Sequence, residues 1–347
     1  MNFASIVCIF RQKIVTLHRI CTLRDMTNKE LYREFCHRTS DLPIFMQDWW
    51  MDAVCAGKQW DVLLSFDKQG EIQAAMPYLL RKRLWVKYIV MPQQTQIGGI
   101  WIVKSEERES GIESLESEIC QDFARQLSAL DLGYYAQHYP ISSPAVESMR
   151  ALGFKTKERV TYRIEDLSDL DKVISRFSKN KKRQLQKALS LHAESNMNIE
   201  DFYRFHVRCL QAQGKQISYS REFLLVLERK AARLNRSEIL SICDADHKVL
   251  AAAFLVWDEK RMYYLIPCYD PQYKDSGANA LLVLEAIKLA RQKGVAFDFE
   301  GSMIRSIANH YKQFGSTRTV YYSVEKYYKW WFWFANAYNW LRERKMR

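Results

Sequence analysis

The residues with the clearest chemical potential lie in the stretch PQYKDSGANALL, from Pro271 to Leu282. Apolar residues at spacings of three and four predict a helix that begins near Ser276 to Asn279 and ends at Gly294. The first amides of a helix lack partners and the helix dipole favours negative charge there, so the loop can hold an anion such as a pyrophosphate. A plain connection between a strand and a helix is the alternative. The predicted contact residues are Lys274, Asp275, Ser276, Gly277, Ala278 and Asn279.

The elements that must position this loop occur in two similar series. WDVLLSFDKQGEIQAAMPYLL predicts a hairpin with its turn at Gln69–Gly70, and SEILSICDADHKVLAAAFLVW predicts a second hairpin with its turn near Asp246–His247. Further on, each half has a helix that ends at an aromatic-flanked glycine before a strand, in MRALGFKTKERVTYRI and HYKQFGSTRTVYYSV. We interpret this order as a duplicated α/β unit. A chance match of generic α/β elements is the alternative.

The fold class that follows is a mixed α/β (α+β) fold of two domains. Each domain is expected to hold a mostly antiparallel sheet flanked by helices, over residues 26–160 and 161–325. Between the two hairpins we expect a helix capped by Ser168 or Asp169 and a basic helix after it. Helices at Ile199–Gln213 and Arg221–Leu234 and a third strand in RMYYLIPCYD complete the second domain.

The net charge of +12 suits an anionic partner: a phosphorylated cofactor, a nucleic acid or a lipid headgroup. One basic cluster comprises Lys179, Lys181, Lys182, Arg183 and Lys187. It could be a solvated helix face, or it could contact phosphates of an acceptor or of tRNA. No aromatic residue interleaves with the cluster, so base stacking has no support.

The eight cysteines form no CxxC pair, which is typical of reduced, buried thiols in a cytosolic protein. The seven histidines are scattered along the chain, so the sequence predicts no metal site.

Both termini are unusual. Residues 1–25 are too basic and interrupted for a membrane span, so we expect a non-native or flexible extension, with Met26 as the true start. A helix on the membrane surface is the alternative for this segment. Residues 326–347 predict an aromatic and basic helix. It could pack across a domain interface, form a dimer contact, or lie on a membrane with its cations on anionic lipid. The membrane reading, through Tyr327–Arg347, would place a cytoplasmic protein at the inner face of the membrane.

The loop resembles the GNAT acyltransferase superfamily. PQYKDSGANALL is similar to the form PEYRGKGIG..LL, with Pro271, Tyr273, Gly277 and Leu282 in matching places. Lys274 stands where that family has Arg or Gln, and Asn279 stands where it has Gly or Ala. Together with PIFMQDWWMDAV, NKKRQLQKA, FDFEGS and YKQFGS, the chain looks most like the Fem-type (FemAB-like) proteins, which carry two GNAT-like domains in tandem.

This resemblance implies acyl-CoA, such as acetyl-CoA, as co-substrate and no metal. The loop would grip the pyrophosphate, and strand amides near Ile266 and Cys268 would bind the pantetheine or the oxyanion. Tyr311, four residues before Gly315, would be the general acid that protonates the leaving thiolate, unless it simply packs at a helix end. His310 lies on a different face of that helix.

Acyl transfer also needs a base for the attacking amine. Asp298 and Glu300 alternate with Phe297 and Phe299, so a strand would place both carboxylates on one face. Glu300 could instead cap a helix that begins near Ser302.

The predicted function is therefore an N-acyltransferase that moves an acyl group from acyl-CoA to an amine of an acceptor, with a cell-envelope role among the options. One alternative is a Fem-like transferase that uses aminoacyl-tRNA and acts on a cell-wall precursor. No heptad pattern for the long coiled-coil arm of several Fem proteins is present, which disfavours tRNA mildly. The other alternative is a non-catalytic binding protein at the membrane face.

Overall fold

The computed structural model describes residues 26–55, 59–83, 85–103, 112–301 and 303–332. The predicted extension, residues 1–25, and most of the predicted C-terminal helix, from residue 333 onward, lie outside the described residues. The first two residues assigned to that helix, Lys326 and Tyr327, instead continue a strand.

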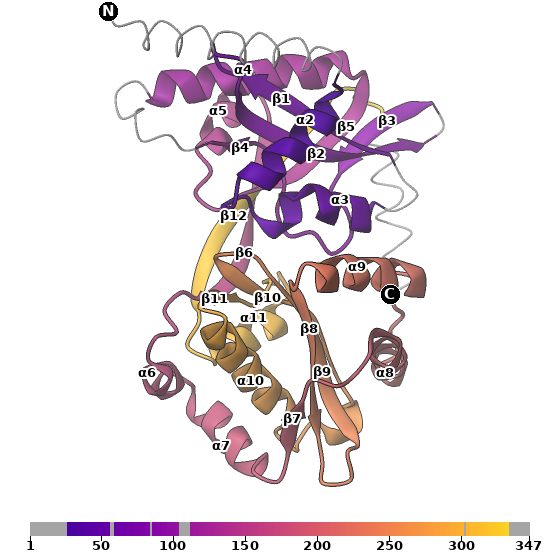
Figure 1. Cartoon of the computed structure of the whole chain (residues 1–347), viewed down its shortest axis with the longest axis vertical. Coiled ribbons are helices and arrows are strands. Elements are labelled where there is room, and N and C mark those ends of the chain that lie inside the picture. Colours follow the sequence, from indigo (N-terminus) through magenta and orange to yellow (C-terminus); the bar gives the residue numbers. More distant parts are fainter. Residues whose placement is uncertain (1–25, 56–58, 84, 104–111, 302, 333–347) are drawn as a thin grey trace, which may run out of the picture.

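Two series of elements follow one another along the chain (Figure 1). The N-terminal half, residues 26–164, has the helices α2 (Asn28–Arg38), η1 (Ile44–Met46), α3 (Asp48–Val54), α4 (Ile112–Ala129) and α5 (Ala145–Ala151). Its strands are β1 (Trp60–Phe66), β2 (Ile72–Arg83), β3 (Val86–Val90), β4 (Trp101–Ile102), β5 (Leu132–Tyr139) and β6 (Lys155–Ile164).

The C-terminal half, residues 165–332, repeats this order after an additional segment of α6 (Leu170–Ser175), α7 (Lys179–Lys187) and β7 (His192–Glu194). Its further helices are α8 (Ile199–Ala212), α9 (Arg221–Arg233), η3 (Pro271–Tyr273), α10 (Ala278–Gln292) and α11 (Arg305–Lys312). Its further strands are β8 (Ser237–Cys243), β9 (Val249–Trp257), β10 (Arg261–Tyr269), β11 (Ala296–Asp298) and β12 (Thr317–Tyr327).

The predicted duplication is visible in the pairing. Each half has an antiparallel hairpin, β1–β2 and β8–β9, and one parallel pair joined by a crossover helix, β3 with β5 and β10 with β11. The remaining pairs are antiparallel, which confirms the mostly antiparallel mixed sheet flanked by helices.

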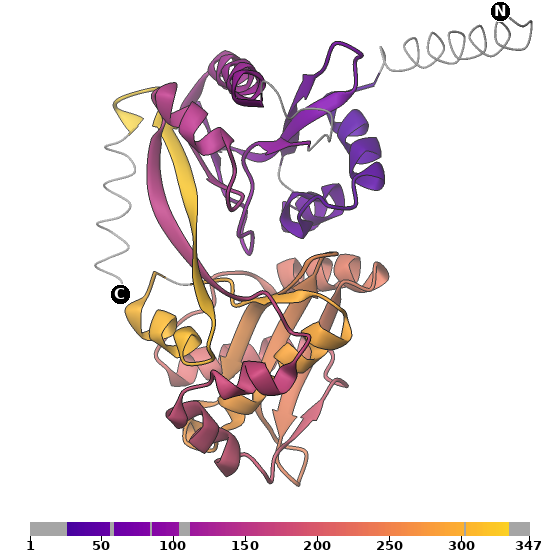
Figure 2. The same cartoon turned by 90° about the vertical axis from the view of Figure 1, so that its left-hand side faces the viewer.

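The two halves exchange their long strands. The sheet runs β1-β2-β3-β5-β12-β6-β11-β10-β9-β8-β7, with β4 on β2. Thus β12, from the C-terminal half, pairs with β5, and β6, from the N-terminal half, pairs with β11. Figure 2 shows β6 and β12 side by side as they pass between the halves. The predicted boundaries after residues 160 and 325 therefore fall inside these two strands.

The helices begin where local chemistry favours it. The side chains of Asp169, Ser178, Asn198 and Ser220 each accept a hydrogen bond from the backbone N–H three residues later and cap α6, α7, α8 and α9. Asp169 is thus the cap of the helix that the sequence predicted. None of the helices in the described ranges is long and apolar enough to cross a membrane.

Apolar side chains from the two halves share one core. The rings of Phe45 and Tyr263 lie 4.6 Å apart between centroids, and α3 packs against α9 across the junction. A second core lies under α10 and α11, and a third under α4 and α5. The sheet face toward the shared core therefore joins the halves, while its opposite face in the C-terminal half packs on α10.

Candidate functional site

A cavity of about 690 Å³ lies between the two halves. Apolar side chains such as Ile97, Ile100 and Trp101 line it from the N-terminal half. The opposite wall carries the cations Arg163, Lys260 and Arg261. An apolar cavity with a few converging charged groups is the usual form of a small-molecule site.

The charges on this wall are mostly paired. Arg261 donates to Glu165 at 2.9 Å, and Lys260 lies 3.6 Å from Asp41. The Nε of Arg261 is buried and has no hydrogen-bond partner among the described residues. A buried donor of this kind costs free energy unless something accepts from it, so the wall offers an anionic group of a ligand one unused cationic donor.

Arg163 connects the cavity to a buried polar network. Its Nε donates to Asp298 at 2.6 Å, and Asp298 is completely buried. The other Asp298 oxygen accepts from the Thr161 hydroxyl, from Gln96 at 3.3 Å and from the backbone N–H of Glu300 at 2.8 Å. Donors therefore surround both carboxylate oxygens, so Asp298 is suited to hold Arg163 in place.

Glu300 lies beside this network with an unused oxygen. Its Oε1 is buried and has no partner in the described part of the chain. Burial, together with the nearby charge of Asp298, raises the pKa of Glu300 well above its usual range, although Arg163 opposes the rise. Glu300 also has a left-handed backbone, with φ of 63°. Non-glycine residues in this conformation are held by their surroundings and concentrate at functional sites.

Two expectations about Glu300 need correction. β11 ends at Asp298, and the left-handed turn breaks the alternation, so Asp298 and Glu300 do not share one strand face as predicted. They meet instead through the backbone N–H of Glu300. The next helix begins at Arg305 with Ile304 as its cap, so Glu300 does not cap it.

Tyr311 lies on the other face of the sheet from Asp298. Its ring packs against Phe299, 4.6 Å away between centroids, and against Tyr162 at 6.2 Å. Burial raises the pKa of Tyr311, and the charges of Glu300 and Asp298 add to the rise, so its phenol stays protonated. The structure therefore brings Tyr311 near Glu300 but not into the wall lined by Arg163.

The loop predicted to bind an anion folds as expected, and some of its polar groups already hydrogen-bond to one another. α10 begins at Ala278 with Gly277 as its left-handed cap. The Ser276 hydroxyl donates to the Tyr273 carbonyl at 2.7 Å and accepts from the Ala278 amide at 3.1 Å. Lys274 and Asp275 are exposed at the loop surface, and Asn279 is half-buried in the first turn.

Gly277 permits a close approach, but by protein rather than by a ligand. A Cβ at this position would overlap the Gln184 carbonyl oxygen of α7. The prediction that Gly277 contacts the anion is therefore corrected, because α7 packs against α10 and occupies the space beside this glycine. An anion at this loop would have to contact the exposed side, next to Lys274.

The predicted amides of Ile266 and Cys268 also need correction. The Asp270 amide donates to the Leu250 carbonyl on the β9 side. Antiparallel pairs alternate in hydrogen bonding, so the Cys268–Ala252 and Ile266–Phe254 pairs belong to the same bonded class. Their amides face β9 and not the gap toward β11. The Tyr269 amide faces the gap, and Pro267 has no N–H.

Sequence reasoning missed one buried cation. Lys181 of α7 is 3% exposed, and its ammonium donates to Gln184 Oε1 at 3.0 Å and lies 3.1 Å from His310 Nδ1. Burial lowers the pKa of Lys181 to about 8 and that of His310 to about 4, so His310 accepts from Lys181. Helical spacing could have shown it, because Lys181 lies four residues from both Phe177 and Leu185 on the apolar stripe.

The family comparison matches this geometry to a known class. The sequence matches the family model for the acetyltransferase (GNAT) domain over residues 150–313, which include the α10 loop, Asp298, Glu300 and Tyr311. Residues 150–313 are thus similar to a GNAT domain. The matched range starts in α5 and ends after α11, so it contains every site residue that the sequence predicted.

Solved structures extend the likeness over both halves. The crystal structure of FemX aligns with a TM-score of 0.64 and 13% identity, over 86% of this chain and 96% of its own. A conserved protein of unknown function from Bacteroides thetaiotaomicron aligns with a TM-score of 0.54 and 10% identity, over 86% and 97%. At such identities these structures show a shared, FemX-like fold alone. No curated protein sequence matches the chain at a significant level.

Proposed function

We propose that this protein is an N-acyltransferase that moves an acyl group from acyl-CoA to an amine of an acceptor bound in the cavity between the halves. The observation that carries the proposal is Glu300: a buried carboxyl with an unpaired oxygen, a raised pKa and a left-handed backbone, tied to the cavity wall through Asp298 and Arg163. The GNAT domain supports the acyltransferase class.

In the proposed reaction, Glu300, Tyr311 and Asp298 each have one role. The acceptor amine loses a proton to the Glu300 carboxylate as its nitrogen bonds to the thioester carbon. The carbon–sulfur bond then breaks, and Tyr311, held neutral by burial, donates a proton to the departing thiolate. Asp298 keeps Arg163 oriented. A raised pKa makes the ionised Glu300 carboxylate a stronger base.

The unused donor of Arg261 suits an acceptor with a negative group besides its amine, and the carboxylates Asp41 and Glu165 that also line the cavity are already paired with cations. Arg261 has an unused buried donor, and Arg163 and Lys260 lie on the same wall. A carboxylate or phosphate placed there would accept from Arg261 with the strength of a charge-assisted hydrogen bond. Acceptors of this kind include amino-acid and phosphorylated components of the cell envelope.

We propose that the donor binds at the start of α10. β10 and β11 pair only from Arg261 to Tyr263, after which they diverge and leave the Tyr269 amide facing the gap. Lys274 is exposed at the end of this gap and would add charge for a pyrophosphate.

A thermal-shift titration with acetyl-CoA tests the donor. A ligand that binds only the folded state stabilises it by about 2.7 kcal/mol at roughly 100 times Kd. We expect a shift in the wild type and in Arg291→Glu, at the far end of α10, and a reduced shift in Lys274→Glu. Release of free thiol in the presence of amine acceptors then measures transfer. No shift at millimolar acetyl-CoA overturns the acyl-CoA proposal.

One observation favours an aminoacyl-tRNA donor as the second candidate. α7 occupies the space beside Gly277 and carries four exposed cations, Lys179, Lys182, Arg183 and Lys187. Such a face can neutralise phosphates of a nucleic acid. tRNA binding that weakens steeply with salt, and that is lost when these four residues are replaced by Gln, would support this donor over acyl-CoA.

We also propose that the protein works in the cytoplasm at the inner face of the membrane. The β2–β3 turn exposes Trp85 and the cations Arg81, Lys82, Arg83 and Lys87. The ring of Tyr88, in β3, lies 5.5 Å from that of Phe332, so the start of the aromatic C-terminal segment adjoins this turn, and Trp330 is exposed there too. Exposed tryptophans among cations suit a surface of anionic lipid.

Vesicle co-sedimentation tests this location. Wild type and Leu234→Ala, which removes an exposed apolar residue from the C-terminal half, should bind phosphatidylserine vesicles. Trp85→Ala should bind more weakly. Vesicle binding without thiol release from any acyl-CoA would instead support the non-catalytic membrane-face protein, and equal binding by Trp85→Ala would remove the turn from the proposal.

A further inference from the structure

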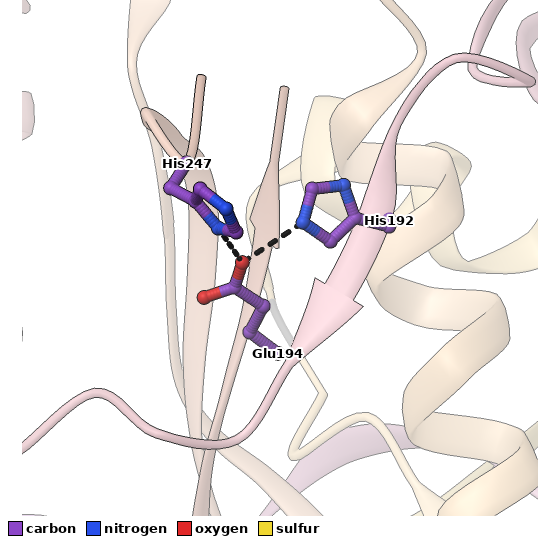
Figure 3. Close-up of side chains that lie close together, drawn as sticks. All are labelled: His192, Glu194 and His247. Atoms are coloured by element: carbon purple, nitrogen blue, oxygen red, sulfur yellow. Dashed lines mark hydrogen bonds and ion pairs between the residues drawn. The ribbon is translucent and has the colours of Figure 1, made fainter. Parts of the chain in front are cut away.

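Three side chains with metal-ligating atoms meet at the outer edge of the sheet in the C-terminal half (Figure 3). His192 Nε2 and His247 Nδ1 lie 2.8 Å and 2.6 Å from the same oxygen, Oε1 of Glu194. All three ligand atoms lie within 4.8 Å of one another. This cluster is separate from the residues that line the cavity between the halves.

The fold presents these side chains together for simple reasons. His192 and Glu194 are two residues apart in the edge strand β7, so they share one face. β7 pairs with β8, which places it beside the β8–β9 turn that carries His247. The Asp244 carboxylate accepts from the amides of Asp246 and Lys248 and fixes that turn, and His247 has a left-handed φ of 58°.

We propose that His192, Glu194 and His247 bind a divalent transition-metal ion, with Zn²⁺ as the best match. Two imidazoles and one carboxylate are a common zinc ligand set, and imidazole also suits copper and nickel. A tetrahedral ion would have one further position for water or another ligand. The sequence predicted no metal site because 53 residues separate Glu194 from His247 and no local spacing signals the set.

The geometry requires only a small adjustment. Zinc bonds of about 2.0–2.1 Å to nitrogen and oxygen place neighbouring ligand atoms about 3.3 Å apart in a tetrahedron. The two N···O distances must therefore open by roughly half an ångström or slightly more. Glu194 is the more fixed ligand, with 16% of its side chain exposed, whereas 76% of His247 is exposed and free to turn.

The neighbouring groups are compatible with a cation. The Glu194 carboxylate accepts from both imidazoles, so the three ligand atoms already converge on one oxygen. Cys243 lies opposite His192 across the β7–β8 ladder and is buried in the sheet.

A bound ion would tie the edge strand to the turn, and the turn continues toward the start of α10. Lys248, next to His247, donates a hydrogen bond to the hydroxyl of Tyr273. Tyr273 ends η3, four residues before the Gly277 cap of α10. Metal binding at this edge would therefore steady the loop that leads into α10. This inference does not depend on the proposed transferase activity.

The test is zinc binding by the full chain after removal of metal with a chelator. Isothermal titration with Zn²⁺ compares wild type, His247→Ala, His192→Ala and the matched control His37→Ala, which removes an exposed histidine in α2. We expect one site in wild type and control, weakened at least tenfold in His247→Ala and His192→Ala. Visible absorption of the Co²⁺-loaded protein should follow the same pattern.

Circular dichroism separates loss of the site from loss of the fold. His247 is exposed in a turn, so its alanine variant should keep the wild-type spectrum. Absence of stoichiometric binding in the wild type overturns the proposal and leaves a metal-free hydrogen-bonded cluster. Equal Zn²⁺ affinity in folded His247→Ala also overturns it, because the ion would then sit elsewhere on the chain.

Discussion

The two halves share a frame but use the gap between their parallel strands differently. In the N-terminal half, β3 leaves β5 after Ile89, and the following loop takes its place. The Gly98 amide donates to the His138 carbonyl at 2.6 Å, and the Gln96 carbonyl lies 3.0 Å from His138 Nδ1. That half fills its own gap with backbone.

In the C-terminal half the equivalent region retains buried polar atoms without partners among the described residues. The Tyr264 hydroxyl and Glu300 Oε1 are both of this kind. Buried polar groups are normally satisfied, so each unsatisfied one needs an explanation such as a ligand or a reaction. The N-terminal loop also holds one such atom, Gln96 Oε1, so the two halves differ mainly in the loop backbone that fills the N-terminal gap.

The largest expected effect comes from Glu300→Gln. Loss of a general base typically lowers turnover by 100- to 10,000-fold, and the neutral amide should leave the folded state at least as stable. The matched N-terminal variant is Gln94→Ala, at a left-handed residue in the loop after β3 and outside the residues that line the cavity. It should retain turnover. Thiol-release kinetics with thermal melts measures both, and near-normal turnover in Glu300→Gln would remove it from the mechanism.

The repeated glycines offer a second contrast. Gly315 and Gly153 both have a positive φ, but a Cβ on Gly315 would lie 2.5 Å from the Arg176 Cβ, whereas Gly153 has open space. Gly153→Ala should lower the free energy of unfolding by about 1–2 kcal/mol from backbone strain. Gly315→Ala should lose a further 1–3 kcal/mol from the clash. Urea denaturation measures the difference, and equal losses would contradict the packing of α6 against this turn.

Lys181 marks the segment that only the C-terminal half shows among the described residues. Its pKa is about 8 in the folded state against 10.5 in the unfolded chain, so the unfolded state binds more protons between these values. The burial of charged Lys181 therefore lowers the free energy of unfolding by its full amount below pH 8. This loss of stability disappears as the pH rises through 10.5, where the side chain is neutral in both states. Lys181→Met should gain about 2 kcal/mol at pH 7 and nothing near pH 10.5.

Chemical denaturation at both pH values checks the Lys181 prediction. Lys182→Met on the exposed face of α7 is the control, with little change at either pH. A destabilised Lys181→Met at pH 7 would show that its hydrogen bonds to Gln184 and His310 outweigh the cost of burial.

The smallest effect concerns the closed gap. Burial lowers the pKa of His138 from 6.5 in the unfolded chain to about 4, and the charge of Arg159 contributes. The free energy of unfolding is therefore unaffected by this residue above pH 6.5 and decreases as the pH falls from 6.5 toward 4, because only the unfolded chain takes up the proton. His138→Gln should reduce the loss of unfolding free energy between pH 7 and pH 5.5 by about 1 kcal/mol. His37→Gln is the exposed control, and an unchanged pH slope in His138→Gln would contradict the burial of this ring.

The sequence predicted the local elements because their signals are local. Both hairpins, the Asp169 cap and the start of α10 follow from turn residues, caps and apolar spacing within a few positions. The exchange of β6 and β12 is set by pairings between distant segments, which no short pattern encodes. Hence the predicted boundaries fell inside strands.

The site was predictable in composition but not in orientation. Asp298, Glu300 and Tyr311 lie near one another, as predicted. Asp298 and Glu300 do not share a strand face, because β11 ends at Asp298 whereas the alternation predicted a strand through Glu300. The prediction for the Ile266 and Cys268 amides was wrong, because alternate amides of β10 point toward β9. Which amides face the gap depends on which residue pairs hydrogen-bond to β9. Lys181 was counted among exposed cations because the charge pattern concealed its apolar stripe.

The exchanged strands also set the order in which this chain can fold during synthesis. β5 emerges from the ribosome long before β12, yet β12 is the neighbour that covers its edge from Tyr134 to Tyr139. Until then the N-terminal half has an open sheet edge, the kind of surface that pairs with other chains. Folding must wait for contacts distant in sequence, which makes it slow and exposed to aggregation. Nascent chains that stop before Thr317 should therefore need chaperones, whereas chains that include Tyr327 can close the sheet.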